Sequence, residues 1–504
     1  MVARRRVLRG LGYLLVWLVV AVPAWGLLFS HSSTEMVVAS HDAVVRPNFD
    51  GQVRLDMGPY LPDVRSTSGG WIGVDIVGGK TTATTAPELA VRYAAIAAHP
   101  DAEQQRVREE IGDLLADSAL RAAVLGLVPI GLWLLLGASR RAELRRRVAP
   151  RSVAASVTAV AVVVVLVAQP WRHEPEHVGD GVWLNVAKAF PEVSVPPELS
   201  GWEIQGGFVT EGTRRLVFSL LDTYKTSKVF YRDVADRMDE VTDRLHPKGE
   251  GETVAVEVSD RHDNIGMDEV VRAAADAAGA TVVIDAGDDT STGQPWEGFS
   301  LDSLDNAFGG DEYDARVAIS GNHDHGTFVS RYLQKRGWTH LTGKAVTPFA
   351  DVRIIGVDDP RSSGLGNWRD QKGLTFDEVK ATVADDVCKL DEQGDRIATL
   401  VVHDANLGAT ALERGCTDLV LAGHLHVQKG PTRVLGTNGK VGYSYTNGTT
   451  GGAAYAIAIG SKLRRDAEFT FVTYRDGRPV GIQPVTVQTT GMVSVADYVP
   501  LDLG

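Results

Sequence analysis

The sequence predicts a layered α/β domain (α+β in its later part) that follows a membrane-spanning N-terminal region. Three observations lead to this expectation. Long uncharged apolar runs occur in the first third of the chain. From residue 253 onward, short β-type runs alternate with helical stretches, which is the pattern of layered α/β architecture. After residue 430 the helical stretches give way to further β-type runs, so this part of the domain adds more sheet.

Three apolar runs are candidates for membrane-spanning helices, at residues 11–29, 122–138 and 153–169. A span takes about 20 apolar residues and at least about 17, so the third run is short. Two alternatives stay open. The first run resembles a signal peptide with a weak cleavage site before Trp25, although it exceeds the usual ~7–15 apolar residues. The other two runs resemble a buried helical hairpin, which the arginines between them disfavour.

The arginines predict an orientation for these spans. They cluster in residues 1–10 and 139–151, and short arginine-rich segments stay in the cytoplasm. We therefore expect an integral protein of the cell membrane with a cytoplasmic N-terminus. Residues 30–119 and the chain after about 170 would lie outside the cytoplasm.

The outer segment at 30–119 is expected to form a small subdomain. Its residues 40–80 alternate short apolar pieces with turn residues, which predicts a few strands. Residues 86–119 are typical of helix in one or two pieces, with Pro100 as a break.

The remaining boundaries follow from changes in pattern. Residues 171–252 are expected as a connector that contains an amphipathic helix at 222–245, which begins at a capping Asp222. The α/β domain is expected to span 253–490, and residues 491–504 would form a C-terminal tail.

Composition excludes some classes of protein. The chain of 504 residues is too long for one ordinary domain. Its net charge of −13 argues against nucleic-acid binding, because phosphate backbones attract basic surfaces. Two cysteines, Cys388 and Cys416, exclude a cysteine-rich metal site. A disulfide between them is permitted outside the cytoplasm, and both the paired and the free state stay open.

Residues of metal-binding type follow the ends of five β-type runs. They are Asp260 with His262, Asp288, Asn322 with His323, His403, and His424 with His426. In open α/β sheets, sites form at the carboxyl ends of the strands. Any one of these residues is more often a hydrogen-bonded loop residue than a ligand. Five such strand ends in one domain predict a shared site.

The order of these residues resembles the calcineurin-like metallophosphoesterase family. The pattern is D-x-H, G-D, G-N-H-D, H and G-H-x-H, carried by Asp260–His262, Gly287–Asp288, Gly321–Asp324, His403 and Gly423–His426. The resemblance covers roughly residues 253–460, less than half of the chain. It implies two facing β-sheets flanked by helices and the activity of a metal-dependent phosphoric ester hydrolase.

The resemblance also implies two divalent metal ions. One would bind Asp260, His262 and His426, the other would bind Asn322, His403 and His424, and Asp288 would bridge them. Such mixed ligands suit Mn, Fe or Zn. Two ions about 3.5–4 Å apart can clamp a phosphoryl group and generate a hydroxide nucleophile, so the implied substrate is a phosphomonoester or phosphodiester.

Other residues are assigned roles around this centre. The resemblance makes His323 the general acid that protonates the leaving oxygen, with Asp324 orienting it. His325 is not required by the pattern and is expected at the surface more than in the pocket. Arg361 and Arg369, in a long polar segment at 358–373, are candidates with His325 for contacting the substrate. A solvated loop explains that segment equally well.

Two further functions compete with the enzyme. A retired phosphoesterase domain that serves as an extracytoplasmic binding or signalling module is the alternative, and it would predict the loss of at least one ligand position, yet all are filled. Three spans without internal charge make a poor transport pathway. Membrane anchoring favours a substrate at the membrane or envelope. The sequence leaves the physiological substrate and the oligomeric state open.

Overall fold

The protein is described from a computed structural model. The described residues are 2–56, 63–81, 89, 100–147, 182–189, 201–205, 226–310, 312–364, 367–370, 374–453 and 462–504. They form two compact units. The smaller unit comprises Met1–Thr82 and Glu103–Val217, and the larger unit comprises Ala83–Ala102 and Phe218–Gly504.

Two long helices of the smaller unit pack against each other, α1 (Val2–Ser30) and α3 (Pro100–Leu135). The indole Nε1 of Trp17 donates to the carbonyl of Ala123 at 2.9 Å. Gly126 makes room for this ring, since a Cβ there would lie 2.8 Å from Trp17 Cδ1. Within the described residues, two helical stretches are long and apolar enough to cross a membrane, Gly10–Ser30 and Gln104–Leu135.

The helix α3 is continuous across two segments that are predicted as separate elements, residues 86–119 and the apolar run at 122–138. Pro100 begins this helix, and the second apolar run continues the polar helix before it without interruption. The change at residue 122 is one of composition and not of conformation. A short helix α4 (Ala138–Arg147) follows and carries the predicted arginine cluster. The third apolar run, at 153–169, lies outside the described residues.

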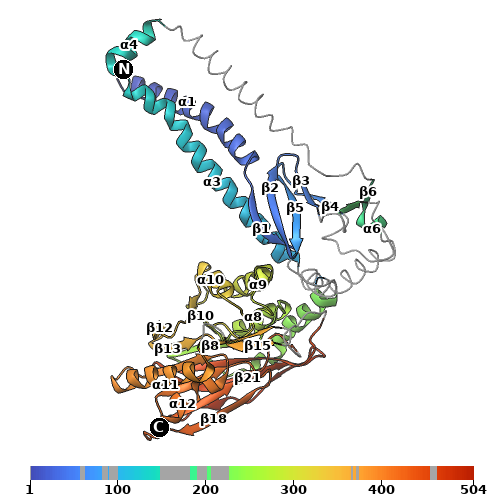
Figure 1. The fold of residues 1–504 in the computed structure, drawn as a ribbon, viewed down its shortest axis with the longest axis vertical. Helices are drawn as coiled ribbons and strands as arrows, with labels where there is room; N and C mark the ends of the chain where they lie inside the picture. The colour runs from blue at the N-terminus through green and yellow to red at the C-terminus, as the bar shows by residue number, and fades with distance from the viewer. Residues whose placement is uncertain are drawn as a thin grey trace. The chain divides into compact units, whose positions relative to one another are not determined.

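A seven-stranded sheet completes the smaller unit beside α3 (Figure 1). Its strands, in spatial order, are β1 (Thr34–Val38), β2 (His41–Asn48), β5 (Gly73–Thr81), β3 (Gln52–Asp56), β4 (Val64–Thr67), β7 (Glu203–Gln205) and β6 (Trp183–Asn185), with the helical turn α6 (Val186–Ala189) after β6. Val64 pairs with Ile204 across β4 and β7. The predicted connector therefore supplies two strands to this sheet, because strands this short gain stability only by joining a larger one.

The larger unit contains two sheets with a shared core. The eight-stranded sheet holds β11 (Thr339–His340), β10 (Ala315–Ala318), β9 (Val282–Asp285), β8 (Glu252–Val258), β20 (Ala467–Arg475), β21 (Arg478–Val487) and β22 (Val493–Val495), with β23 (Val499–Pro500) also on β21. The six-stranded sheet holds β12 (Val346–Phe349), β13 (Val352–Val357), β16 (Ile397–Val402), β17 (Thr417–Ala422), β19 (Val441–Thr446) and β18 (Lys429–Leu435). Ile284 and Val317 of the first sheet pack with Ile354 and Leu419 of the second.

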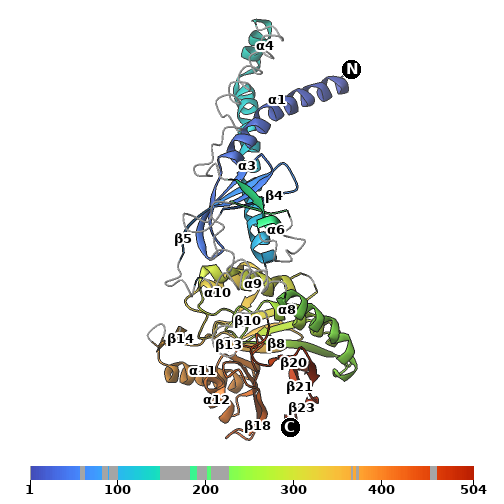
Figure 2. The same cartoon turned by 90° about the vertical axis from the view of Figure 1, so that its right-hand side faces the viewer.

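Helices cover the outer faces of this pair of sheets (Figure 2). The helices α8 (Gly266–Ala278), α9 (Gly298–Phe308) and α10 (Phe328–Lys335) pack with the 3₁₀ helix η3 (Arg237–Arg244) on the eight-stranded sheet. The helices α11 (Phe376–Glu392) and α12 (Ala405–Glu413) cover the six-stranded sheet. This arrangement agrees with the expected sandwich of facing sheets flanked by helices.

Several segments differ from the sequence expectation. The expected helix at 222–245 is described from residue 226 and changes to 3₁₀ geometry at Arg237, while Asp222 is not among the described residues. The expected tail at 491–504 contributes β22 and β23 to the sheet, because both pair with β21. The helix α9 is not among the predicted elements, although its buried Leu301, Leu304 and Phe308 recur at helical spacing.

Cys388 and Cys416 form a disulfide with a Cα–Cα distance of 4.9 Å that ties α11 to the residue before β17. The closed loop has a sequence separation of 28, so removing the bond should cost about 3–4 kcal/mol of unfolding free energy through loop-closure entropy. Denaturant unfolding of the full chain, with the double Cys388→Ser/Cys416→Ser variant, measures this cost. Adding reductant should not change the unfolding midpoint of the double variant. A wild type whose unfolding midpoint is equally insensitive to reductant would contradict the prediction.

Candidate metal centre

The predicted ligand residues lie in loops at the carboxyl ends of parallel strands. The strands β8, β9 and β10 run parallel in one sheet, and β13, β16 and β17 run parallel in the other. The loops that leave β8, β9, β16 and β17 meet at one edge of the sandwich. They bring together Asp260, His262, Asp288, His403 and His426.

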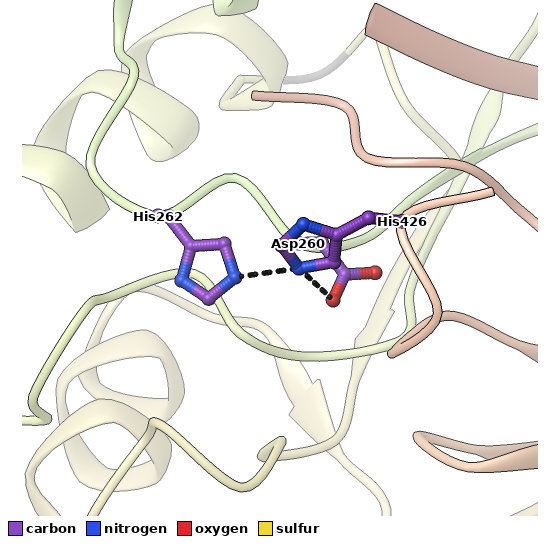
Figure 3. Close-up of side chains that lie close together, drawn as sticks. All are labelled: Asp260, His262 and His426. Carbon is purple, nitrogen blue, oxygen red and sulfur yellow. Dashed lines mark hydrogen bonds and ion pairs between the residues drawn. The ribbon is translucent and has the colours of Figure 1, made fainter. Parts of the chain in front are cut away.

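The first group at this edge consists of Asp260, His262 and His426, whose potential ligand atoms all lie within 4.8 Å of one another. The Nε2 atom of His426 lies 3.1 Å from His262 Nε2 and 3.3 Å from Asp260 Oδ1 (Figure 3). The other ring nitrogen of His426 is 3.0 Å from the carbonyl of Ala453. A carbonyl can only accept, so Nδ1 carries a proton and Nε2 is left for a cation.

The second group consists of Asp260, Asp288 and His403. His403 Nε2 lies 3.1 Å from Asp288 Oδ2 and 3.9 Å from Asp260 Oδ1. Its Nδ1 lies 2.8 Å from the carbonyl of Ala286, which again directs Nε2 into the site. Asp288 Oδ2 is also 3.7 Å from His262 Nε2. Asp288 therefore lies between the two groups, where a bridging carboxylate belongs.

Asn322 precedes His323, whose N–H donates to Asp288 of the second group. His424 lies beside His403 of that group. The Oδ1 atom of Asn322 is buried and has no hydrogen-bond partner among the described residues. A buried amide oxygen without a partner is costly, and a metal ion would satisfy it. The ring of His424 lies 5.1 Å from that of His403, and its backbone N–H donates to Asp260 at 2.9 Å. These donors fit the predicted second ion.

The backbone at the site is held in an uncommon conformation. The residues with positive φ include Asp260 (53°), His262 (46°), Asp288 (61°), His424 (72°) and His426 (55°). Left-handed backbone at a non-glycine residue costs roughly 1–3 kcal/mol and clusters at functional sites, where the surrounding fold enforces it. The strain therefore marks these five predicted ligand positions independently of their side chains.

Two glycines of the predicted pattern allow the loops to approach closely. A Cβ at Gly321 would overlap the carboxylate of Asp288, and a Cβ at Gly423 would overlap Asp260 and Ser259. Any larger residue would push a ligand-bearing loop away from its neighbour. The glycines next to Asn322 and His424 are thus explained by space.

The charges at the site compensate one another in the absence of a metal ion. Burial lowers the pKa of His262 to about 3, so its imidazole is neutral. Burial also disfavours charge on His403 and His426, but Asp288 and Asp260 outweigh it and raise both pKa values. The raised pKa values favour a proton on each of these two rings, and a metal ion would compete with it. Since ligating imidazoles must be deprotonated, metal binding would release protons.

The loop after β8 is fixed by Arg261, for which no sequence pattern predicts a role beyond its place between two ligands. Its guanidinium is fully buried and pairs with Asp268 at 2.5 Å and Asp289 at 3.0 Å. It also donates to the carbonyl of Ser300 at 3.1 Å. Arg261 thereby connects the loops after β8 and β9 to α8 and α9.

His323 lies beside the first group, with its ring 5.1 Å from that of His262. Its backbone N–H donates to Asp288 Oδ1 at 2.7 Å, and its ring Nδ1 lies 3.1 Å from the carbonyl of Ser291. Asp324 is expected to orient this ring, yet its carboxylate forms its hydrogen bonds elsewhere. The carboxylate of Asp324 accepts from the backbone N–H groups of Gly321, Asp288 and Thr290 instead. It joins the loops after β9 and β10.

The three candidates for substrate contact lie on or near the hairpin of β14 (Arg361–Gly364) and β15 (Asn367–Asp370). His325 is half-buried and bonds through Nε2 to the carbonyl of Ser363, so it is less exposed than expected. Arg361 pairs with Asp359 at 2.7 Å and with Asp404 at 2.9 Å, and its guanidinium is held by carboxylates. Arg369 pairs with Ser362 in register, and its side chain is not among the described parts.

No protein-family model matches the chain, and no curated protein matches it. Among solved structures, the chain is similar to the sulfate thiohydrolase SoxB of Thermus thermophilus in complex with glycerol, with 16% sequence identity and a TM-score of 0.29. The similarity covers 46% of this chain and 44% of that chain, so the chain matches less than half of the SoxB chain. A likeness of this extent assigns a role to no residue here.

Proposed function

We propose that this protein is a membrane-anchored, outward-facing hydrolase of phosphate esters that uses two divalent metal ions. The observation that carries the proposal is the convergence of Asp260, His262, Asp288, His403 and His426 at one buried edge. Within each of the two groups the ligand atoms lie within 4.8 Å of one another, which is close enough to hold a shared cation. Carboxylate and imidazole donors together suit Mn, Fe or Zn.

The residues present fit the two expected ions. Asp260, His262 and His426 would hold one ion, Asn322, His403 and His424 would hold the other, and Asp288 would lie between them. When bound, such ions stabilise charge on a phosphoryl group and make water more acidic. The orphaned Oδ1 of Asn322 supports the second position.

His323 would supply the proton for the leaving group. Its Nδ1 is held by the carbonyl of Ser291, so Nε2 is the nitrogen that can deliver a proton to the leaving oxygen. The backbone N–H of the same residue donates to Asp288. This contact couples the position of the imidazole to the carboxylate that lies between the expected ions.

The extracytoplasmic location rests on separate observations. The helices α1 and α3 contain the two apolar stretches that could span a membrane. Arginines lie at the start of α1 and within α4, which favours a cytoplasmic location for those ends. The Cys388–Cys416 disulfide is typical of an oxidising compartment. The substrate would then be a phosphate ester of the membrane or envelope.

The test is hydrolysis by the full-length chain in detergent. The protein is stripped of metal, reloaded with Mn²⁺, and offered an aryl phosphomonoester and an aryl phosphodiester side by side. We expect turnover that needs Mn²⁺, and the faster ester identifies the substrate class. A folded protein that binds Mn²⁺ and hydrolyses neither ester would favour the binding or signalling module.

A further inference from the structure

The proton donor in the proposed function is oriented by backbone and not by a carboxylate. The Nδ1 atom of His323 lies 3.1 Å from the carbonyl oxygen of Ser291. Because that oxygen only accepts, it fixes a proton on Nδ1 and the orientation of the ring. The position of one carbonyl group therefore decides where Nε2 of His323 points.

The segment that carries this carbonyl is held by one buried carboxylate, that of Glu297. Glu297 Oε1 accepts from the backbone N–H groups of Ser291 and Thr292, both at 2.8 Å. Glu297 Oε2 accepts from the Thr292 hydroxyl at 2.8 Å and from the Gln294 N–H at 2.6 Å. Glu297 is fully buried at the end of the short 3₁₀ helix η4 (Pro295–Glu297). Four donors on one carboxylate leave the segment little freedom.

A second contact presses the same segment onto the loop of His323. Gly293 has a φ of 66°, and a Cβ there would overlap the backbone of Asp324 and His325. The N–H of Ser291 also donates to Asp263 at 3.1 Å. The segment 291–294 is thus fixed on both sides, and Glu297 makes most of its hydrogen bonds.

We infer that Glu297 is a positioning residue that orients His323 through segment 291–294 and the carbonyl of Ser291. The inference rests on the proposed function, since it concerns the proton delivered to the leaving group. In that step the P–O bond to the leaving group breaks with its electron pair on the leaving oxygen, and the oxygen of a water molecule forms the new P–O bond and releases one proton to solvent. The leaving oxygen takes the proton from Nε2, and the neutral ring keeps its proton on Nδ1.

The test is the Glu297→Gln variant of the full chain. The amide keeps the size of the side chain, but its NH₂ group replaces one carboxylate oxygen. This NH₂ group is a donor and would face either the N–H of Gln294 or the N–H groups of Ser291 and Thr292, which are donors as well. General acid catalysis contributes about 10²–10⁴-fold and matters most for poor leaving groups. We expect kcat/KM for an alkyl phosphate to fall about 10–100-fold. For 2,4-dinitrophenyl phosphate, whose leaving group needs no proton, the fall should be under about threefold.

The matched control is Glu378→Gln. Glu378 occupies the same position of a capping box, at the start of α11, but it is exposed and lies outside the site. This variant should leave the ratio of the kcat/KM values for the two substrates unchanged. In a His323→Asn background, Glu297→Gln should have little further effect on the alkyl phosphate, because both changes act on the same proton.

Amide hydrogen exchange reports on the order of segment 291–294 independently of enzymatic activity. In the wild type the amides of Ser291, Thr292 and Gln294 should exchange slowly, and Glu297→Gln should speed them. Unchanged exchange rates of these amides, or an equal fall in kcat/KM for both substrates, would overturn the inference without contradicting the proposed hydrolase activity. A wild type that hydrolyses neither substrate with Mn²⁺ would overturn the proposed function and the inference that rests on it.

Discussion

Replacing Asp288 with asparagine should lower metal-dependent hydrolysis by about a thousandfold or more. Metal ions supply several kcal/mol of transition-state stabilisation, and each ~1.4 kcal/mol is tenfold in rate. Asp288 lies 3.1 Å from His403 and 3.7 Å from His262, so it contributes to both groups. An amide lacks the charge that a bridging ligand needs. Its oxygen can still accept from the His323 N–H, so the loop should keep its shape.

The measurement pairs kcat/KM at saturating Mn²⁺ with the metal content of the purified protein. Asp314→Asn is the control, because Asp314 is exposed before β10, at the opposite end of that strand. It should retain full activity and metal content. An Asp288→Asn protein with normal metal content and near-normal activity would remove this carboxylate from the centre.

The Arg261→Met substitution should destabilise the larger unit by about 3–5 kcal/mol. Breaking a buried pair leaves its partners as uncompensated charges, and here Asp268 and Asp289 are almost fully buried as well. Urea unfolding of the full chain in detergent, followed by tryptophan fluorescence, measures the loss. Arg414→Met is the matched control, because its pair with Asp385 is exposed and should contribute at most about 1 kcal/mol.

A second variant separates charge from packing at this position. Removing all three charges together, as Arg261→Met with Asp268→Asn and Asp289→Asn, should cost less than Arg261→Met alone, because no unpaired charge is left buried. If the single substitution is as mild as Arg414→Met, the pair has no structural importance.

The site was more predictable from the sequence than the structure around it. Residues such as His403 and Asp288 follow buried apolar strands directly, and parallel strands end at a common edge. Their convergence could therefore be expected from order alone. The left-handed backbone of His262 or His426 leaves no trace in the sequence, because it is imposed by the loops that pack around each residue.

Residues that act through distant partners were not predictable. Arg261 reaches Asp268 and Asp289, and Glu297 reaches back to Ser291, and nothing in local pattern or spacing indicates these pairs. Asp324 was assigned to the His323 ring because the two are adjacent in sequence, whereas its carboxylate serves the backbone of two loops. The helix α9 is different, since the spacing of Leu301, Leu304 and Phe308 could have revealed it.

The pairing of Val64 with Ile204 has a consequence for how the chain is threaded. Residues that share a ladder of hydrogen bonds must lie on the same side of a bilayer, so the chain between them crosses it an even number of times. If α3 crosses once, two crossings are the smallest number. If α1 crosses as well, the N-terminus lies on the side of the bilayer opposite to the sheet.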